Sequence, residues 1–119
     1  MKYVLLLSLI LVSFFGTSQS STIHITEFSQ NDIKNGILID VRTPEEFANG
    51  HLEGAINMNW YDKDFAGHLS NISKDETIYV YCKKGGRSTK AQKKLISLGF
   101  SNVINLEGGY DACFDAKKK

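Results

Sequence analysis

The sequence predicts a small α/β domain with a mostly parallel central sheet flanked by helices. Short apolar runs rich in β-branched and aromatic residues, such as 77–81, alternate with segments of helical spacing, and no internal repeat is present. The 119 residues, of which 42% are hydrophobic and 23% charged, are sufficient for one globular domain. Ligands of such sheets bind beyond the carboxyl ends of the strands, so we expect the stretches after Val41, Tyr81 and Leu106 to converge.

The first residues have the pattern of a secretory signal peptide. Lys2 supplies a positive charge, residues 4–15 are apolar apart from two serines, and small residues follow over 16–21. The apolar stretch is shorter than the roughly 20 residues of a membrane-spanning helix. We therefore predict a signal over residues 1–20, cleaved near 18–22, and a domain over 22–116. The protein is expected to be exported, periplasmic or secreted, without stable membrane insertion.

The remaining elements follow from apolar runs, caps and turn residues. Strands are expected at 23–25, 37–42, 54–58, 77–81 and 103–106. Helices are expected after an N-cap at Thr26 through residue 34, after Thr43 and Pro44, over 62–69, over 88–98, and finally through Phe114. The run 77–81 is the most apolar and is predicted to be the central strand.

A cysteine-containing loop, residues 82–88, joins the predicted central strand to the longest helix. Backbone N–H groups of such a loop and of the helix N-terminus favour an anion, and a thiol placed there is favoured as thiolate. Lys83, Lys84 and Arg87 add positive potential around Cys82, although loop lysines are often simply solvated. Cys82 is accordingly a candidate nucleophile, and the alternative is a buried structural cysteine.

Charge and residue spacing restrict the other classes of function. A formal net charge of +1 argues against a general nucleic-acid binder. The three histidines lack the spacing of a metal site, so we predict no metal and no cofactor, and a monomer is expected. A structural disulfide between Cys82 and Cys113 is not favoured, whereas a transient one, with Cys113 resolving an oxidised Cys82, stays open.

Four stretches occur in an order that is similar to one family. They are Asp40-Val41-Arg42-Thr43-Pro44-Glu45-Glu46-Phe47, Gly50-His51-Leu52-Glu53-Gly54-Ala55-Ile56-Asn57, Tyr79-Val80-Tyr81-Cys82 through Arg87-Ser88, and Leu106-Glu107-Gly108-Gly109-Tyr110. Together they resemble the single-domain rhodanese family over nearly all of the chain after the signal. Cys113 departs from the family pattern, in which many relatives carry an aromatic residue at that place.

The resemblance implies a sulfurtransferase. Cys82 would accept a sulfane sulfur from a small anionic donor, thiosulfate or a low-molecular-weight persulfide, and pass it to a thiol or protein acceptor. The substrate-binding residues would be Lys83, Lys84, Gly85, Gly86, Arg87 and Ser88. Asp40 would lie near the loop, Arg42 would pair with an acid such as Glu46, and His51 would make a structural hydrogen bond.

The loop length separates related chemistries. Four residues lie between Cys82 and Arg87, as in the rhodaneses that this loop resembles, whereas related phosphatases and arsenate reductases have one more. Two further alternatives stay open from the sequence. One is a non-catalytic binding module with the same fold, and the other is a thiol redox protein that uses Cys82 and Cys113.

Overall fold

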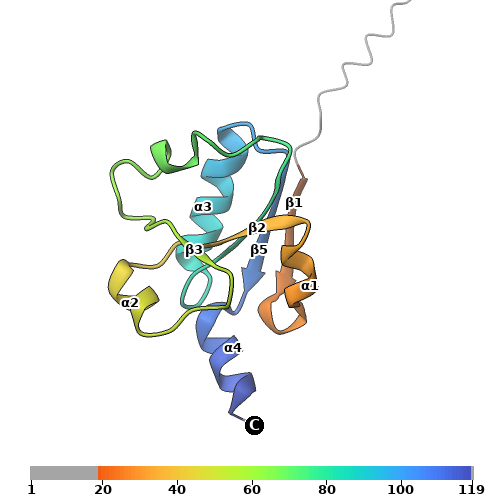
Figure 1. Ribbon diagram of the computed structural model, residues 1–119, viewed down its shortest axis with the longest axis vertical. Helices are drawn as coiled ribbons and strands as arrows, with labels where there is room; N and C mark the ends of the chain where they lie inside the picture. Colours follow the sequence, from red (N-terminus) through yellow and green to blue (C-terminus); the bar gives the residue numbers. More distant parts are fainter. Residues whose placement is uncertain (1–18, 119) are drawn as a thin grey trace, which may run out of the picture.

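The structure is a computed structural model, and it describes residues 19–118. Five strands and six helical segments alternate along the chain (Figure 1). The strands are β1 (Gln19–His24), β2 (Gly36–Asp40), β3 (Ile56–Asn57), β4 (Thr77–Tyr81) and β5 (Asn102–Glu107). The α-helices are α1 (Gln30–Ile33), α2 (Pro44–Ala48), α3 (Gly86–Ser97) and α4 (Gly109–Lys117), and the 3-10 segments are η1 (Ile25–Glu27) and η2 (Gly67–Leu69).

The five strands form one parallel sheet in the order β1-β5-β4-β2-β3. This confirms the predicted α/β class, and β4 lies in the middle as expected. In β4, Ile78 and Val80 are fully buried on one face of the sheet and Tyr81 on the other. A strand covered on both faces reads as a continuous apolar run, which explains the composition of 77–81.

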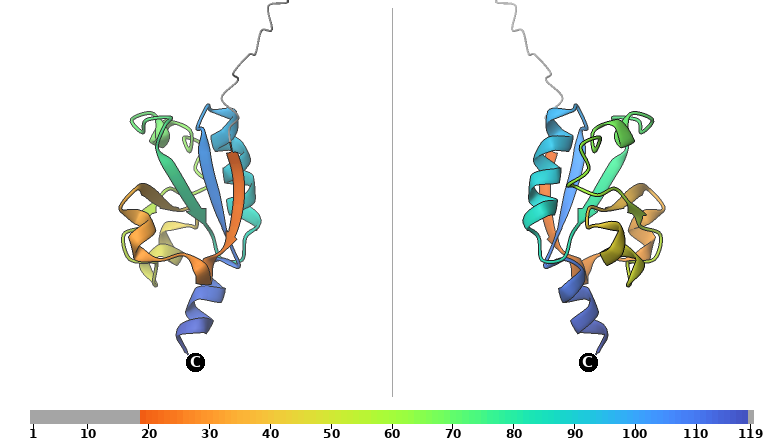
Figure 2. Two further views of the ribbon diagram at one scale, coloured as in Figure 1. Left: turned by 90° about the vertical axis from the view of Figure 1, so that its right-hand side faces the viewer. Right: turned by 90° about the vertical axis from the view of Figure 1, so that its left-hand side faces the viewer.

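Two hydrophobic clusters cover the two faces of the sheet. Ala91 and Leu95 of α3 pack with Phe65, Leu69 and the sheet residues of the first face. The second cluster comprises Ile25, Leu38, Leu52, Tyr81 and Leu106, with partly buried residues of α1 and α4 against it. Figure 2 shows α3 and α1 on opposite sides of the central strands. The domain thus has the three layers expected of helices packed on both faces of a parallel sheet.

Several predicted boundaries are corrected by the structure. Thr26 is not a helix N-cap; it lies inside η1, and α1 begins after Ser29, whose N–H donates to the Asp32 carboxylate at 2.9 Å. The segment 62–69 is not a helix and contains only the short η2. There, Asp62 accepts hydrogen bonds from the Asp64 N–H and from His68, and such local side-chain bonds compete with helix formation.

The first strand begins earlier than its apolar residues predict. β1 starts at Gln19 and pairs in parallel with β5 from Gln19 opposite Asn102 to His24 opposite Glu107. Residues 19–21 are polar, so only the pairing with β5 identifies them as strand. Residues 1–18 lie outside the described part, and the signal peptide therefore stays a prediction. Within residues 19–118, no helix has both the length and the apolar character needed to cross a membrane.

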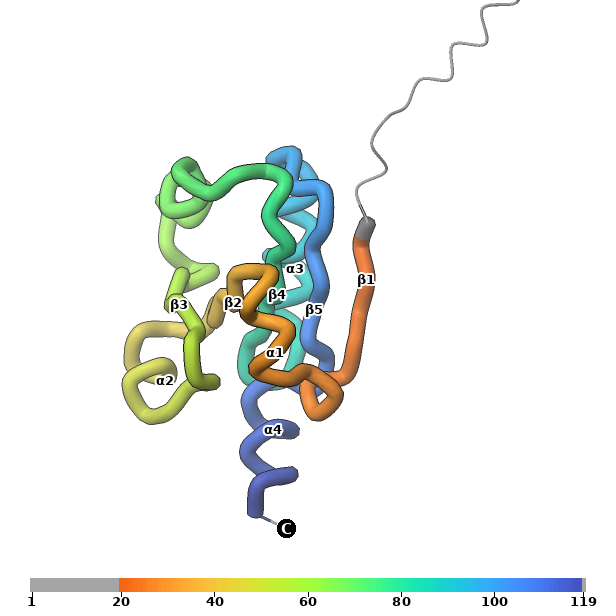
Figure 3. The backbone as a smooth tube through the Cα atoms, turned by 45° about the vertical axis from the view of Figure 1, so that its right-hand side comes forward, coloured from red at the N-terminus to blue at the C-terminus, as the bar shows by residue number. Residues whose placement is uncertain are grey.

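The carboxyl ends of the strands meet at one edge of the sheet, where α4 begins (Figure 3). The Val41 N–H donates to the Tyr81 carbonyl at 3.0 Å, and the Tyr110 N–H donates to the Cys82 carbonyl at 2.8 Å. These bonds join the segments that follow β2, β4 and β5. The convergence expected from the sequence is confirmed, and it places the cysteine loop at the centre of this edge.

Candidate active site

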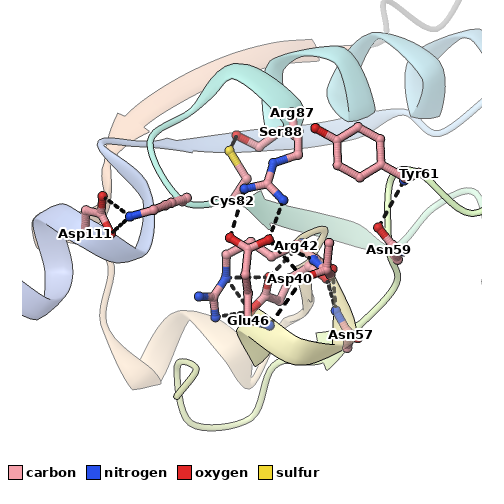
Figure 4. Close-up of polar contacts among 12 residues, drawn as sticks. Asp40, Arg42, Glu46, Asn57, Asn59, Tyr61, Cys82, Arg87, Ser88 and Asp111 are labelled. Carbon is pink, nitrogen blue, oxygen red and sulfur yellow. Dashed lines mark hydrogen bonds and ion pairs between the residues drawn. The ribbon is translucent and has the colours of Figure 1, made fainter. Parts of the chain in front are cut away.

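Cys82 directly follows β4, and its side chain lies beneath the loop that leads into α3 (Figure 4). The Gly85 N–H donates to Cys82 Sγ at 3.0 Å, and Ser88 Oγ lies 3.5 Å from the same sulfur. Ser88 is fully buried, and its hydroxyl donates to the Gly85 carbonyl at 3.2 Å. The loop thus closes around the sulfur through Gly85 and Ser88.

The surroundings of Cys82 favour its thiolate. Burial of the sulfur on its own raises the pKa, because it disfavours the charged form. Hydrogen bonding by the Ser88 side chain and by the backbone N–H groups of Ser88, Gly85 and Lys84 outweighs burial, so the pKa of Cys82 is lowered from its ordinary value. A thiol with a lowered pKa is a nucleophile near neutral pH.

The backbone of the loop depends on Gly85. Its φ is +127°, a conformation that side-chain-bearing residues rarely adopt, and its N–H donates to Cys82 Sγ. The helix α3 begins at Gly86, two residues before the predicted start at Ser88. Gly86, Arg87 and Ser88 therefore form the first helical turn, and the positive end of the helix dipole faces the sulfur.

Arg87 is paired within the protein, and this pair holds the cysteine loop against α2. Arg87 Nη1 and Nη2 donate to the two carboxylate oxygens of Glu46 at 2.7 and 3.0 Å. The Arg87 hydrogen bond is the main cause that lowers the pKa of Glu46 to about 2, and Thr43 contributes further. The expectation that Glu46 pairs with Arg42 is wrong, because the Glu46 carboxylate is already taken by the bidentate Arg87.

Arg42 instead pairs with Asp40 of β2. Arg42 Nη2 donates to Asp40 Oδ2 at 2.7 Å, and Arg42 Nε donates to Oδ1 at 3.0 Å; both residues are buried. Arg42 also donates to the Gly50 carbonyl at 2.7 Å and lies 4.3 Å from the centre of the Tyr110 ring. Asp40 is adjacent to Tyr81 in the sheet, so it lies near the loop as expected. The geometry gives the pair a supporting role below the loop.

The start of α4 clamps the other side of the loop. The N–H groups of Tyr110 and Asp111 donate to the carbonyls of Cys82 and Lys83 at 2.8 and 3.1 Å. The Lys83 ammonium is paired with the Asp111 carboxylate at 2.9 Å. A Cβ on Gly109 would lie 2.6 Å from the Cys82 carbonyl oxygen, so only glycine permits this approach. Sequence reasoning missed Asp111, and the Gly108-Gly109 pair was the available signal.

Cys82 lies at a pocket of about 300 Å³ whose other lining residues are Lys83, Lys84, Gly86, Arg87 and Lys90. The structure thus brings together the residues predicted from 82–88 and adds Lys90, one helical turn after Gly86. Among residues 19–118, Lys84 and Lys90 have no ion pair, whereas Lys83 and Arg87 are paired with Asp111 and Glu46. Lys84 and Lys90 are therefore the cations available to an anion in this pocket.

Two other predicted residues lie away from the sulfur or play supporting roles. Cys113 is half-buried on α4 in the cluster on the second face, whereas Cys82 belongs to the first, and both thiols are free. His51 Nδ1 lies 2.9 Å from the Phe47 carbonyl, and its ring stacks on Phe47, in agreement with a structural role. Within residues 19–118, no cluster of three or more metal-ligating side chains is present.

A parallel sheet with a thiolate-stabilising loop between its central strand and the following helix defines an α/β protein with thiol-centred chemistry. The family model described as a rhodanese-like domain matches residues 25–116. The chain belongs to the rhodanese-like domain family.

Relatives and solved structures agree with this membership. Thiosulfate sulfurtransferase GlpE of Shewanella oneidensis is 31% identical over 104 residues, which cover 87% of this chain and 96% of that protein. Thiosulfate sulfurtransferase 16, chloroplastic, of Arabidopsis thaliana is 39% identical over 62% of this chain and 70% of its own length. The crystal structure of SSP1007 from Staphylococcus saprophyticus is 33% identical, with a TM-score of 0.66 over 77% of this chain and 91% of that one.

Some relatives are longer than this domain. The chain covers 52% of the protein HIGH ARSENIC CONTENT 1 of Arabidopsis thaliana and 20% of the adenylyltransferase and sulfurtransferase UBA4 of Candida albicans. The similarity to these proteins is therefore limited to one domain. The names of the full-length relatives associate the domain with the sulfurtransferases.

Proposed function

We propose that this protein is a sulfurtransferase that moves a sulfane sulfur through a persulfide on Cys82. The observation that carries the proposal is the position of Cys82 Sγ, which accepts the Gly85 N–H at 3.0 Å and has a lowered pKa, in a residue that lines a pocket together with Lys84, Arg87 and Lys90. The sulfurtransferase names of the relatives support the same class of reaction. The donor is thiosulfate or a low-molecular-weight persulfide, and the acceptor is a thiol or a protein.

The reaction has two steps. The Cys82 thiolate attacks the outer sulfur of thiosulfate, the S–S bond of the donor breaks, and sulfite leaves with the electron pair. The acceptor then attacks the terminal sulfur of the persulfide, the new S–S bond breaks, and Cys82 returns to the thiolate. With cyanide as acceptor the product is thiocyanate. No oxidant or reductant is consumed in either step.

The pocket suits the charged groups of this reaction. Backbone N–H groups at the start of α3 are directed at the sulfur and stabilise negative charge without having to reorient. Lys84 and Lys90 provide positive potential for the anionic donor at the pocket rim. Glu46 and Asp111 hold Arg87 and Lys83, so the loop keeps its shape when the donor leaves.

A thiosulfate:cyanide assay tests the proposal directly. The wild type is expected to form thiocyanate, and Cys82→Ser is expected to lose the activity, at least 100-fold, because the hydroxyl is a much poorer nucleophile at neutral pH. Cys113→Ser is the matched control and is expected to retain the wild-type rate, since Cys113 packs on the other face of the sheet. Equal rates for wild type and Cys82→Ser would overturn the proposal.

Mass spectrometry supplies an independent measurement. After incubation with thiosulfate and removal of the excess, the wild type is expected to gain about 32 Da, the mass of one sulfur atom, on the peptide that contains Cys82. Cyanide is expected to remove this mass. A loss of about 2 Da from a disulfide that joins Cys82 to Cys113, with no gain of sulfur mass, would instead favour the thiol redox alternative.

We also propose, from the N-terminal pattern, that the protein is exported and acts in the periplasm or outside the cell. A monomer is proposed separately, as the expected state of this small domain. Expression of the full chain with cell fractionation tests the location, and N-terminal sequencing of the exported form gives the cleavage site. Size-exclusion chromatography with light scattering tests the monomer. Recovery of the intact 119-residue chain in the cytosol would overturn the export proposal.

A further inference from the structure

A run of cations without acids begins at the cysteine loop and continues along α3. No aspartate or glutamate occurs between Glu76 and Glu107, and this stretch holds six lysines and arginines, which are Lys83, Lys84, Arg87, Lys90, Lys93 and Lys94. All 13 acidic residues of the chain lie outside it, together with the other eight lysines and arginines. The formal net charge of +1 therefore averages over a separation of charge, and the cationic part includes the segment that follows Cys82.

The lysines of α3 form an exposed surface that continues from the pocket of Cys82. Lys90 lines that pocket, and Lys93 and Lys94 follow it by three and four residues, which places them one helical turn further along the same side of α3. All three are exposed, and Figure 2 shows α3 as the outer layer on its side of the sheet. Among residues 19–118, neither these three lysines nor Lys84 is in an ion pair. The α3 cationic surface is defined here as Lys84, Lys90, Lys93 and Lys94.

The stability of α3 does not explain these charges. Negative side chains stabilise the start of a helix, as Glu45 and Glu46 do in α2, but the first turn of α3 has no acid. Lys90 is followed at the third and fourth positions by like charges, which repel one another on a helix surface. Lys94 lies in the last turn, where a cation is favourable. Lys90 and Lys93 gain no such benefit, whereas a partner of opposite charge would bind both.

The α3 cationic surface extends beyond the site of a small sulfur donor. Lys93 and Lys94 lie about one helical turn, roughly 5 Å, past Lys90 and do not line the pocket of Cys82. A small anion bound at Cys82 therefore leaves these two lysines free. We propose that the α3 cationic surface docks an acidic protein, and that docking places a thiol of this protein at Cys82.

Two other kinds of polyanion match the surface less well. A helix that binds a membrane surface buries large apolar side chains beside its cations, but the exposed large apolar side chains of residues 19–118 are Ile56, Tyr61 and Phe114, all outside α3. Nucleic-acid binding depends on a strong excess of positive charge, which a formal net charge of +1 does not provide. An acidic patch on a protein has only to match the α3 cationic surface itself.

The role of the partner's thiol rests on the proposed sulfur transfer. The thiolate of the partner attacks the terminal sulfur of the Cys82 persulfide, the S–S bond to Cys82 breaks, and Cys82 leaves as thiolate, so that the partner carries the persulfide. Docking by itself does not require this reaction. It can be measured with a probe that contains no thiol.

An NMR titration of the ¹⁵N-labelled wild type tests docking without chemistry. The probe is an end-blocked peptide of alternating glutamate and glycine, and the matched peptide has glutamine in place of each glutamate. At about 50 mM salt the acidic peptide is expected to shift the amide signals of residues 84–97 and to bind at least tenfold more tightly than the glutamine peptide, a preference that salt should weaken. Equal affinities, or shifts centred on residues 115–118, would overturn the proposal.

Vesicles of phosphatidylglycerol and a short DNA duplex serve as the other polyanions. At about 0.15 M salt, both are expected to bind more weakly than the acidic peptide. Tighter binding of the vesicles or of the duplex would assign the surface to a membrane or a nucleic acid and would overturn the proposal.

A pair of matched double variants locates the surface. Lys93→Gln with Lys94→Gln removes two cations beyond the pocket and is expected to weaken binding of the acidic peptide roughly fivefold, the size of two exposed ion pairs. Lys117→Gln with Lys118→Gln makes the same change of charge at the end of α4 and is expected to leave the affinity unchanged. An equal loss in both double variants would show attraction by net charge alone and would overturn the proposal.

An acidic peptide that ends in a cysteine tests the transfer step. The wild type is expected to pass sulfur from thiosulfate to it severalfold faster than to the glutamine peptide with the same cysteine. The double variant at Lys93 and Lys94 should lose this preference and keep the thiosulfate:cyanide rate, because neither lysine lines the pocket of Cys82. Thiocyanate formation without a preference between the peptides would overturn docking and leave the sulfurtransferase proposal intact. Binding of the thiol-free acidic peptide without thiocyanate formation would support docking and overturn the proposed function.

Discussion

At the scale of single residues, the reactivity of Cys82 depends on a few hydrogen bonds. Burial opposes the thiolate, and Ser88 and the loop N–H groups more than compensate for it. Ser88 has two roles. Its Oγ accepts from the Cys82 thiol while its own proton goes to the Gly85 carbonyl, and the same proton, turned toward the sulfur, is the one that bonds the thiolate. The loop N–H groups come from the backbone, so Ser88 is the side chain whose removal tests this balance.

Ser88→Ala is expected to raise the pKa of Cys82, since one of the groups that stabilise the thiolate is lost while burial remains. The rate at which iodoacetamide alkylates Cys82, measured against pH, should then rise at a higher pH in Ser88→Ala than in the wild type. At neutral pH the rate in the variant should be severalfold lower. Ser97→Ala removes an exposed hydroxyl of the same helix and serves as the control. An unchanged alkylation profile in Ser88→Ala would contradict this role.

Glu46→Gln is expected to reduce the free energy of unfolding at neutral pH by about 1–2 kcal/mol. The reason is that the substitution removes a partly exposed ion pair with Arg87 and weakens the hydrogen bonds with Thr43. The pKa of Glu46 is about 2 in the folded protein and 4.5 without its partners, so its contribution is complete above pH 4.5 and is lost as the pH falls toward 2. Urea unfolding of both proteins at several pH values measures this.

Glu45→Gln is the control for that experiment, because Glu45 is the exposed neighbour on the same helical turn and is not in an ion pair with Arg87. Its stability should follow the wild type throughout. A Glu46→Gln deficit that persists unchanged at pH 2 would show that the pair with Arg87 is not its cause.

At the scale of elements, the cysteine loop is held from three sides. Its N–H groups belong to the start of α3, its carbonyls are bonded by the start of α4, and Arg87 ties it to α2 through Glu46. The elements that hold it come from distant parts of the chain, so the loop geometry is a product of the complete sheet edge. Gly109 is the position at which α4 approaches the loop most closely.

Gly109→Ala is expected to destabilise the protein by about 1–3 kcal/mol and to reduce sulfur transfer. The added Cβ would lie 2.5 Å from the Lys83 carbonyl oxygen, and the φ of +63° disfavours alanine. Thermal and urea unfolding, together with the thiosulfate:cyanide rate, measure both effects. Gly86→Ala is the stability control, because a Cβ there meets no atom within 4 Å; equal destabilisation of the two variants would contradict the clamp.

At the scale of the whole molecule, β1 closes one edge of the sheet. It pairs with β5 over its full length, and the Ser21 carbonyl accepts a hydrogen bond from the buried Gln92 side chain of α3 at 2.9 Å. The predicted cleavage range of 18–22 overlaps this strand. The position of cleavage therefore affects both the sheet and the packing of α3.

A chain that begins at Gln19 is expected to be more stable than one that begins at Ile23 by about 1–3 kcal/mol. The shorter chain loses four residue pairs of the sheet and one of the two acceptors of Gln92 Nε2, the other being the Val103 carbonyl. Urea unfolding of the two purified chains measures the difference. Equal midpoints would contradict a structural role for residues 19–22.

Much of this protein follows from local sequence. Apolar runs, caps and turn glycines predicted the parallel α/β fold, the central strand 77–81 and the strand–loop–helix around Cys82, because these signals are encoded by neighbouring residues. The same signals gave wrong secondary-structure predictions where the structure of a segment depends on contacts with residues that are not its neighbours in the sequence. The polar residues 19–21 become strand only by pairing with β5, and 62–69 fails to form a helix because Asp62 is bonded to His68.

The site divides in the same way. The sequence by itself determined the nucleophile candidate and the anion-favouring loop, since both lie within residues 82–88. The tertiary structure alone decided that Glu46 pairs with Arg87, that Asp40 holds Arg42, and that α4 clamps the loop. The physical reason is that ion pairs and close approaches depend on distances between segments brought together by the fold, which local residue patterns do not contain.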